Sequence, residues 1–195
     1  MATALRLPRT LDEFLDWEER QPRKWEFVGC RPRLMAGGTI THDRIANNIR
    51  GLLFAALRGR RCSAHGPDLK VLSPAGTSTY PDAIVLCDER DGRRTTCDDP
   101  TVVVEVLSES TAKDDLTRKR RAYQAIPSLR VIVYASQDEP RLDIVRRQPD
   151  GRWEDDEPVE GLEGALALPE VGVTLAMAEI YEDTEVGRAE RSASA

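Results

Sequence analysis

The run TVVVEVLSES, residues 101–110, holds one residue that does not match its neighbours. Its aliphatic residues are typical of a strand that is buried on both faces, and they are Val102, Val103, Val104, Val106 and Leu107. Glu105 interrupts them. Burying a polar group without a partner costs about 2–7 kcal/mol, and an unpaired charge costs more. The sequence therefore predicts a buried strand and a partner for Glu105.

A second acidic residue, Asp82, lies near the start of the preceding predicted strand, YPDAIVLCD at residues 80–88. Strands joined by a loop of this length can be neighbours, which would bring both carboxylates to one edge. Paired carboxylates are held together by a hard cation, and Mg²⁺ takes oxygen ligands of this kind. Two alternatives stay open: Asp82 as a turn residue after Pro81, and Glu105 as half of a buried ion pair.

The predicted helix at residues 111–126 supplies a candidate cation. At helical spacing, one of its faces carries Leu116, Lys119, Tyr123 and Ile126. Lys119 thus lies in the inward stripe of a chain that has 4 lysines and 24 arginines. Lysine is a compact charge whose pKa responds to burial, and arginine does not replace it. The alternative is a lysine stem that lies along apolar surface with its ammonium in water.

Periodicity and turn residues predict a mixture of helices and strands along the rest of the chain. Helices are expected at residues 11–20, from 41 or 43 to 58, and at 174–186. Strands are expected at residues 61–64, 68–72, 130–136 and 141–148, with a hairpin around Gly29 at residues 24–35. We expect residues 1–183 to form one domain and residues 184–195 to be a disordered tail.

Composition favours a cytoplasmic globular protein. The chain has 195 residues, of which 40% are hydrophobic and 32% charged, and no apolar run reaches the roughly 18 residues of a membrane span. Its N-terminus lacks the apolar core of a secretory signal. The cysteines are widely spread and predict free thiols rather than a zinc site: Cys30, Cys62, Cys87 and Cys97.

Charge is divided unevenly along the chain. Residues 1–149 hold 25 basic and 21 acidic side chains, whereas residues 150–195 hold 3 and 13. A basic body keeps a nucleic-acid partner open despite the net charge of −6. The alternative to a nucleic-acid surface is that these side chains are ordinary solvated surface charge. The same alternative holds for Arg118, Arg120 and Arg121. His42 is interpreted as a loop or cap residue, with a phosphate contact as the alternative.

These motifs, in this order, resemble the Uma2-like endonucleases of the PD-(D/E)XK restriction-endonuclease-like superfamily. The resemblance rests on YPDAIVLCD, on VVVEVLSEST, and on the four-residue spacing of Asp115, Lys119 and Tyr123. KWEFVGCRPRLM and THDRIANNI extend it upstream, so that it covers about residues 10–181. The chain departs from the family pattern at three places. Gly29-Cys30 stands where Asp-Gly is frequent, SES stands where Ser-Pro-Ser is common, and AIPSL stands where Gly-Val-Pro is frequent.

The resemblance implies an α+β fold with a restriction-endonuclease-like core, in which a mixed central sheet is flanked by helices. It implies that Asp82 and Glu105 bind Mg²⁺ or Mn²⁺ and that Glu26 is an additional acidic residue of the site. The superfamily lysine, absent where Leu107 stands, would be replaced by Lys119 from the following helix.

Two functions remain after this comparison of motifs. The first is a metal-dependent endonuclease that hydrolyses DNA phosphodiester bonds, with DNA as partner and a homodimer to cut both strands. The second is a non-catalytic module on the same fold that binds nucleic acid or protein. Carboxylates beside a phosphate would serve a metal and would hinder a pure binder, so Glu26, Asp82, Glu105 and Lys119 together favour the enzyme.

Overall fold

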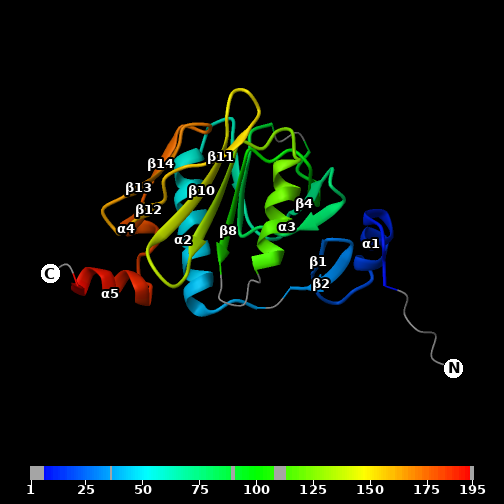
Figure 1. Ribbon diagram of the computed structural model, residues 1–195, viewed down its shortest axis with the longest axis horizontal. Coiled ribbons are helices and arrows are strands. Elements are labelled where there is room, and N and C mark those ends of the chain that lie inside the picture. The colour runs from blue at the N-terminus through cyan, green and yellow to red at the C-terminus, as the bar shows by residue number, and fades with distance from the viewer. Residues whose placement is uncertain (1–6, 36, 89–90, 108–112, 194–195) are drawn as a thin grey trace.

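The computed structural model describes residues 7–35, 37–88, 91–107 and 113–193, and a mixed β-sheet forms its centre (Figure 1). The strand order is β11-β10-β9-β8-β6-β3, with β12 beside β10. The strands are β3 Ser63–His65, β6 Ala83–Leu86, β8 Val102–Leu107, β9 Val131–Ser136, β10 Arg141–Arg147, β11 Trp153–Asp155 and β12 Val159–Glu160. β8 and β9 are parallel and the other pairs antiparallel. The predicted strand around Glu105 is therefore confirmed as β8, inside the sheet.

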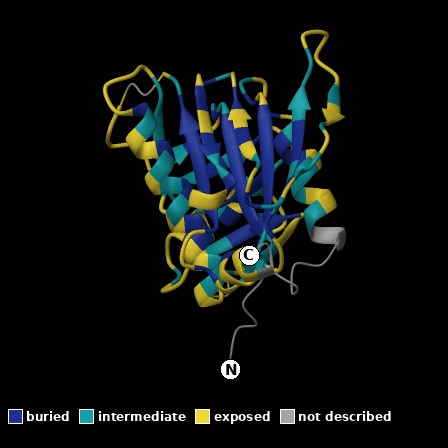
Figure 2. Cartoon of the chain, turned by 90° about the vertical axis from the view of Figure 1, so that its left-hand side faces the viewer, coloured by how far each residue is buried: buried dark blue, intermediate teal, exposed yellow. Residues whose placement is uncertain are grey.

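Two helices cover the two faces of this sheet and explain the continuous apolar run of β8. The face under α2 (Ile40–Leu57) receives Val102, Val104 and Val106, and the face under α3 (Lys113–Gln124) receives Val103. The inner strands are buried along most of their length (Figure 2). No helix in the described part of the chain is long and apolar enough to cross a membrane. The predicted α+β fold with a mixed sheet flanked by helices is confirmed.

A second sheet carries the N-terminal part of the molecule beside α3. Its order is β2-β1-β5-β4-β7, next to α1 (Leu11–Glu18), and its strands are β1 Trp25–Val28, β2 Arg31–Leu34, β4 Lys70–Ser73, β5 Thr77–Thr79 and β7 Thr96–Cys97. β1 and β2 form the predicted hairpin, and its turn places both Gly29 (φ 60°) and Cys30 (φ 58°) in the left-handed region. A two-residue hairpin of this hand needs positive φ at both positions. Gly29-Cys30 therefore still makes the hairpin that carries Glu26.

The C-terminal segment differs from the prediction in two ways. The expected helix at 174–186 is replaced by strand β14 (Val173–Ala176), paired with β13 (Ala165–Leu168), and by the short helix α4 (Met177–Ile180). The alternating burial of Leu166, Leu168, Val173 and Leu175 is the strand period of two. Residues 184–195 were expected to be a disordered tail, whereas Glu185–Ala193 forms helix α5. Thr184 is buried there and its hydroxyl accepts a hydrogen bond from the Gly187 amide, which starts the helix.

The prediction of four free thiols is wrong for two cysteines. Cys62 and Cys87 form a disulfide, whereas Cys30 and Cys97 are free. Cys62 directly precedes β3 and Cys87 directly follows β6, and the register of these antiparallel strands sets the two opposite each other. This pairing depends on strand register and leaves no spacing motif in the sequence. A cytoplasmic location remains a prediction.

Candidate active site

Asp82 and Glu105 face each other across neighbouring strands. β6 and β8 are antiparallel with Ala83 opposite Val104, so one further step of the register sets Asp82 opposite Glu105. Directly opposed residues have Cβ atoms about 4.5–5.5 Å apart and share one face of the sheet. Here that face is the one under α3. The Val106 amide donates a 2.7 Å hydrogen bond to Asp82 Oδ2, which fixes one carboxylate beside the other strand.

Lys119 points inward from α3 and joins the two sheets. Its Nζ lies 2.9 Å from Oε1 of Glu26 on β1 and 3.4 Å from Oε1 of Glu105 on β8. All three side chains are only 11–12% exposed. The helix therefore presents this lysine to two buried carboxylates, while Arg118 and Arg121 are exposed. The structure thus brings together the four residues that the sequence singled out, Glu26, Asp82, Glu105 and Lys119.

Further groups hold the carboxylates in place, and the sequence did not assign them. The Tyr123 hydroxyl donates to Glu105 Oε1 and lies 3.0 Å from Thr79 Oγ1. The Tyr80 amide donates to Glu26 Oε1 at 3.1 Å. Tyr123 could have been found, because it follows Lys119 by four residues on the same helical face. Thr79 and Tyr80 left no signal, since their roles depend on how β5 lies beside β1.

His42 lies closer to the site than the sequence indicated. Thr39 caps α2, and the His42 amide donates to its hydroxyl, so the cap-region interpretation is confirmed. The imidazole Nε2 is also 3.5 Å from Asp82 Oδ2. A Cβ at Gly38 would lie 2.8 Å from His42 Nδ1, so a glycine there lets the imidazole keep this position. The contact follows from the placement of α2 over the sheet edge.

Burial raises the pKa of all three carboxyl groups. For Glu26 and Glu105 the loss of hydration is the largest cause, and Lys119 opposes it. The pKa of Asp82 is raised for the same reason, and His42 opposes the rise. Glu105 and Asp82 also repel each other, because the charge of Asp82 raises the pKa of Glu105 further. Lys119 thus opposes the rise in pKa at all three carboxyl groups, and His42 and Arg50 act beside it at Asp82.

The donor set of the site fits a divalent cation that prefers oxygen. Both hydrogen bonds to Glu105 use Oε1 and the backbone bond to Asp82 uses Oδ2, which leaves Glu105 Oε2 and Asp82 Oδ1 without hydrogen bonds in the described part of the chain. Among the described residues, no three His, Cys, Asp or Glu side chains form a metal cage by themselves. Mg²⁺ commonly takes one or two carboxylates and completes its shell with water and phosphate. The side chain of Asp115 and the residues of SES lie outside the described part.

Comparisons with known proteins agree with this geometry. Residues 11–178 match the family model of Uma2, described as "Putative restriction endonuclease". The uncharacterized protein slr1290 of Synechocystis sp. is 35% identical over 144 residues, which cover 73% of this chain and 76% of the relative. A second uncharacterized Synechocystis protein, sll1609, is 27% identical over 148 residues, 74% of this chain and 84% of that one.

A solved structure shares the fold at low sequence identity. It is the crystal structure of "a putative nuclease belonging to DUF820" from Anabaena variabilis, with a TM-score of 0.72 and 17% identity. The match covers 89% of this chain and 98% of that chain. The predicted restriction-endonuclease-like core is thereby confirmed as a fold.

Proposed function

The chain belongs to the Uma2 family, and on this basis we propose that it is a metal-dependent endonuclease that hydrolyses phosphodiester bonds in DNA. One observation carries the proposal. Lys119 lies between the buried carboxylates of Glu26 and Glu105, and a third carboxyl group, Asp82, is held opposite Glu105. A salt bridge that served stability alone would need one carboxylate. The additional ones repel each other and cost stability unless a cation joins them.

Asp82 and Glu105 would hold Mg²⁺ or Mn²⁺ through Oδ1 and Oε2, which accept no hydrogen bond from the described residues. When bound, such an ion supplies Lewis-acid polarisation of a phosphate and a lower pKa for a coordinated water. The Val106 amide and the Tyr123 hydroxyl keep the two carboxylates oriented, as groups behind metal ligands commonly do. Glu26 accepts hydrogen bonds from both Lys119 and the Tyr80 amide, so Lys119 is not its sole partner among the described residues.

In this proposal Lys119 acts through the positive charge of its ammonium group. Its ammonium has three donors, and it is already placed beside Glu105 in a position that is only 12% exposed. A donor fixed in advance stabilises charge that grows on a phosphate oxygen in the transition state, because it need not reorganise during the reaction. The mildly basic body of residues 1–149 would support binding of the DNA backbone.

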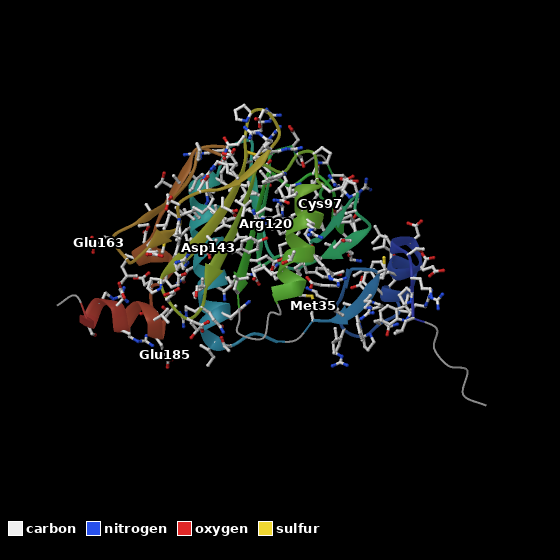
Figure 3. All side chains as sticks on the ribbon, in the orientation of Figure 1. Met35, Cys97, Arg120, Asp143, Glu163 and Glu185 are labelled. Carbon is white, nitrogen blue, oxygen red and sulfur yellow. A yellow bond between two sulfur atoms is a disulfide. The ribbon has the colours of Figure 1, made fainter. Side chains whose placement is uncertain are left out.

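The direct test is cleavage of supercoiled plasmid DNA in Mg²⁺ or Mn²⁺. Wild-type protein should nick or linearise the plasmid, and EDTA should stop it. Glu105→Gln should abolish cleavage, whereas Glu163→Gln removes a carboxylate that is exposed, far from α3 (Figure 3), and should leave cleavage intact. Linear product without accumulation of nicked circles would support a homodimer that cuts both strands. Metal-independent binding with no cleavage would instead favour a non-catalytic nucleic-acid-binding module.

A further inference from the structure

A groove lies on the other side of α3 from Glu26, between this helix and strand β10. Its volume is about 750 Å³, and we call it the α3–β10 groove. Its walls and floor include Leu116, Thr117, Arg120 and Gln124 from α3, with Tyr134 and Asp143 from the sheet. Figure 3 shows Arg120 and Asp143 on these two facing elements. The volume is within the range of about 300–1,000 Å³ that small-molecule sites occupy.

The floor of the groove holds a buried hydroxyl group without a partner. Tyr134 is 4% exposed, and its hydroxyl makes no hydrogen bond in the described structure. Leaving a buried donor unsatisfied costs about 1–3 kcal/mol, so such groups are rare in native proteins. The residue that lines the groove thus carries a buried donor for which the described part of the chain offers no acceptor.

The groove adjoins the proposed active site. β8 and β9 are parallel and Glu105 lies beside Tyr134 in their register, so the two side chains share the face under α3. Neighbouring strands are about 4.8 Å apart. A nucleotide whose phosphate lay at Glu105 could therefore place its base over Tyr134.

The charges in the groove favour a neutral ligand rather than a second phosphate. Three basic and three acidic side chains line it: Arg120, Arg121, Arg141, Asp143, Asp155 and Asp156. Two of the arginines are already paired, Arg120 with Asp155 and Arg141 with Asp143, each at 2.8 Å. Aliphatic groups from Leu116 and Val145 complete the lining. A flat apolar ring with donors and acceptors at its edge matches this mixture, and nucleobases are such rings.

We propose that the α3–β10 groove receives an unstacked nucleobase next to the phosphate that is cut, with the Tyr134 hydroxyl donating to a ring nitrogen or carbonyl oxygen of that base. The proposal rests on the proposed function and narrows its substrate. A base reaches a pocket only after it leaves the helical stack, which costs a few kcal/mol in duplex and least where the strand is unpaired. The preferred substrate is therefore DNA with unpaired nucleotides at the cleavage site.

The test measures binding to a single-stranded oligonucleotide that contains one 2-aminopurine, in EDTA so that no cleavage occurs. Wild-type protein should bind it more tightly than the matched duplex and change the 2-aminopurine fluorescence. Tyr134→Phe should weaken binding about tenfold, the loss of one hydrogen bond. Its melting temperature should not fall, because the hydroxyl has no hydrogen-bond partner among the described residues. Thr117→Trp, an exposed helix position at the groove, should weaken binding at least as much.

Tyr181→Phe is the matched control. The Tyr181 hydroxyl bonds to the Ser136 and Arg141 backbones, so its loss should lower the melting temperature and leave affinity unchanged. Equal affinity of wild type, Tyr134→Phe and Thr117→Trp would overturn the groove proposal, and plasmid cleavage by the same wild-type preparation would show that the proposed nuclease function stands. Binding that depends on Tyr134, without any plasmid cleavage, would contradict the nuclease proposal and leave the groove proposal in place. No binding to any oligonucleotide would overturn the groove proposal as well.

Discussion

Replacing Lys119 by methionine tests whether this cluster is catalytic or only structural. Methionine keeps most of the apolar stem and deletes the ammonium that lies 2.9 Å from Glu26 and 3.4 Å from Glu105. Since all three side chains are 11–12% exposed, the variant leaves two carboxylates in a poorly hydrated site without their cation. Removal of one partner from a buried ion pair costs about 3–5 kcal/mol. For a chain of this size each kcal/mol lowers the melting temperature by about 2–4 °C.

The loss of stability in Lys119→Met should shrink as the pH falls from 8 to 5. Burial already raises the pKa of both glutamic acids, and without the lysine these groups should take up protons at still higher pH. Neutral carboxyl groups need no counter-charge, so urea unfolding at the two pH values should show the smaller difference from wild type at pH 5. Cleavage assays can therefore be run at the pH and temperature where the variant is folded.

Under conditions where it is folded, Lys119→Met should cleave plasmid DNA about 10²–10³-fold more slowly than wild type. Lys119→Arg should rescue poorly, because a planar guanidinium is broader than the ammonium that this buried position holds. Arg152→Met, at the exposed β10–β11 turn on the opposite edge of the sheet, is the charge-matched control. Wild-type cleavage by folded Lys119→Met would refute a catalytic role, and the lysine would then be a structural ion-pair partner.

Three further outcomes follow from the structure. Burial raises the pKa of Glu26, Asp82 and Glu105. The contribution of these groups to the free energy of unfolding is therefore full below about pH 4 and is lost as the pH rises through the raised pKa values. In urea titrations without divalent ions, Glu105→Gln should lose less stability than wild type between pH 5 and 8. Reduction of the Cys62–Cys87 disulfide, which closes 25 residues, should lower the free energy of unfolding by about 3 kcal/mol, and a Cys62→Ser/Cys87→Ser variant insensitive to reductant is the control. DNA binding should weaken steeply between 50 and 200 mM salt, since phosphate contacts release counterions, and a flat response would favour a protein partner instead.

The centre of the fold could be predicted because its signals are local. The apolar run around Glu105 identified β8, and the helical spacing of Lys119 and Tyr123 gave the inward face of α3. The two acidic residues lie together because β6 and β8 are antiparallel neighbours, the arrangement expected from the sequence. Glu26 could be placed in the site only through the family resemblance, since it reaches Lys119 from a separate sheet.

Other features depend on register or on short ambiguous segments. The run TLAMAEI is too short for its period to decide between strand and helix, and it divides into β14 and α4. The position of His42 beside Asp82 and the Cys62–Cys87 bond follow from how distant elements lie side by side. The Tyr134 hydroxyl, which has no hydrogen-bond partner in the described ranges, is visible only in three dimensions, because the sequence shows an ordinary strand tyrosine. Such features leave no local pattern in the sequence.

Titration calorimetry with Mn²⁺ tests the central claim most directly, namely that Asp82 and Glu105 hold a divalent cation. Wild-type protein should bind Mn²⁺ at a site that also raises its melting temperature, since a ligand of the folded state stabilises it by mass action. Glu105→Gln and Asp82→Asn should each abolish both the heat and the rise, whereas Glu163→Gln should keep them. Binding of Mn²⁺ by folded Glu105→Gln with the wild-type heat and affinity would contradict the account.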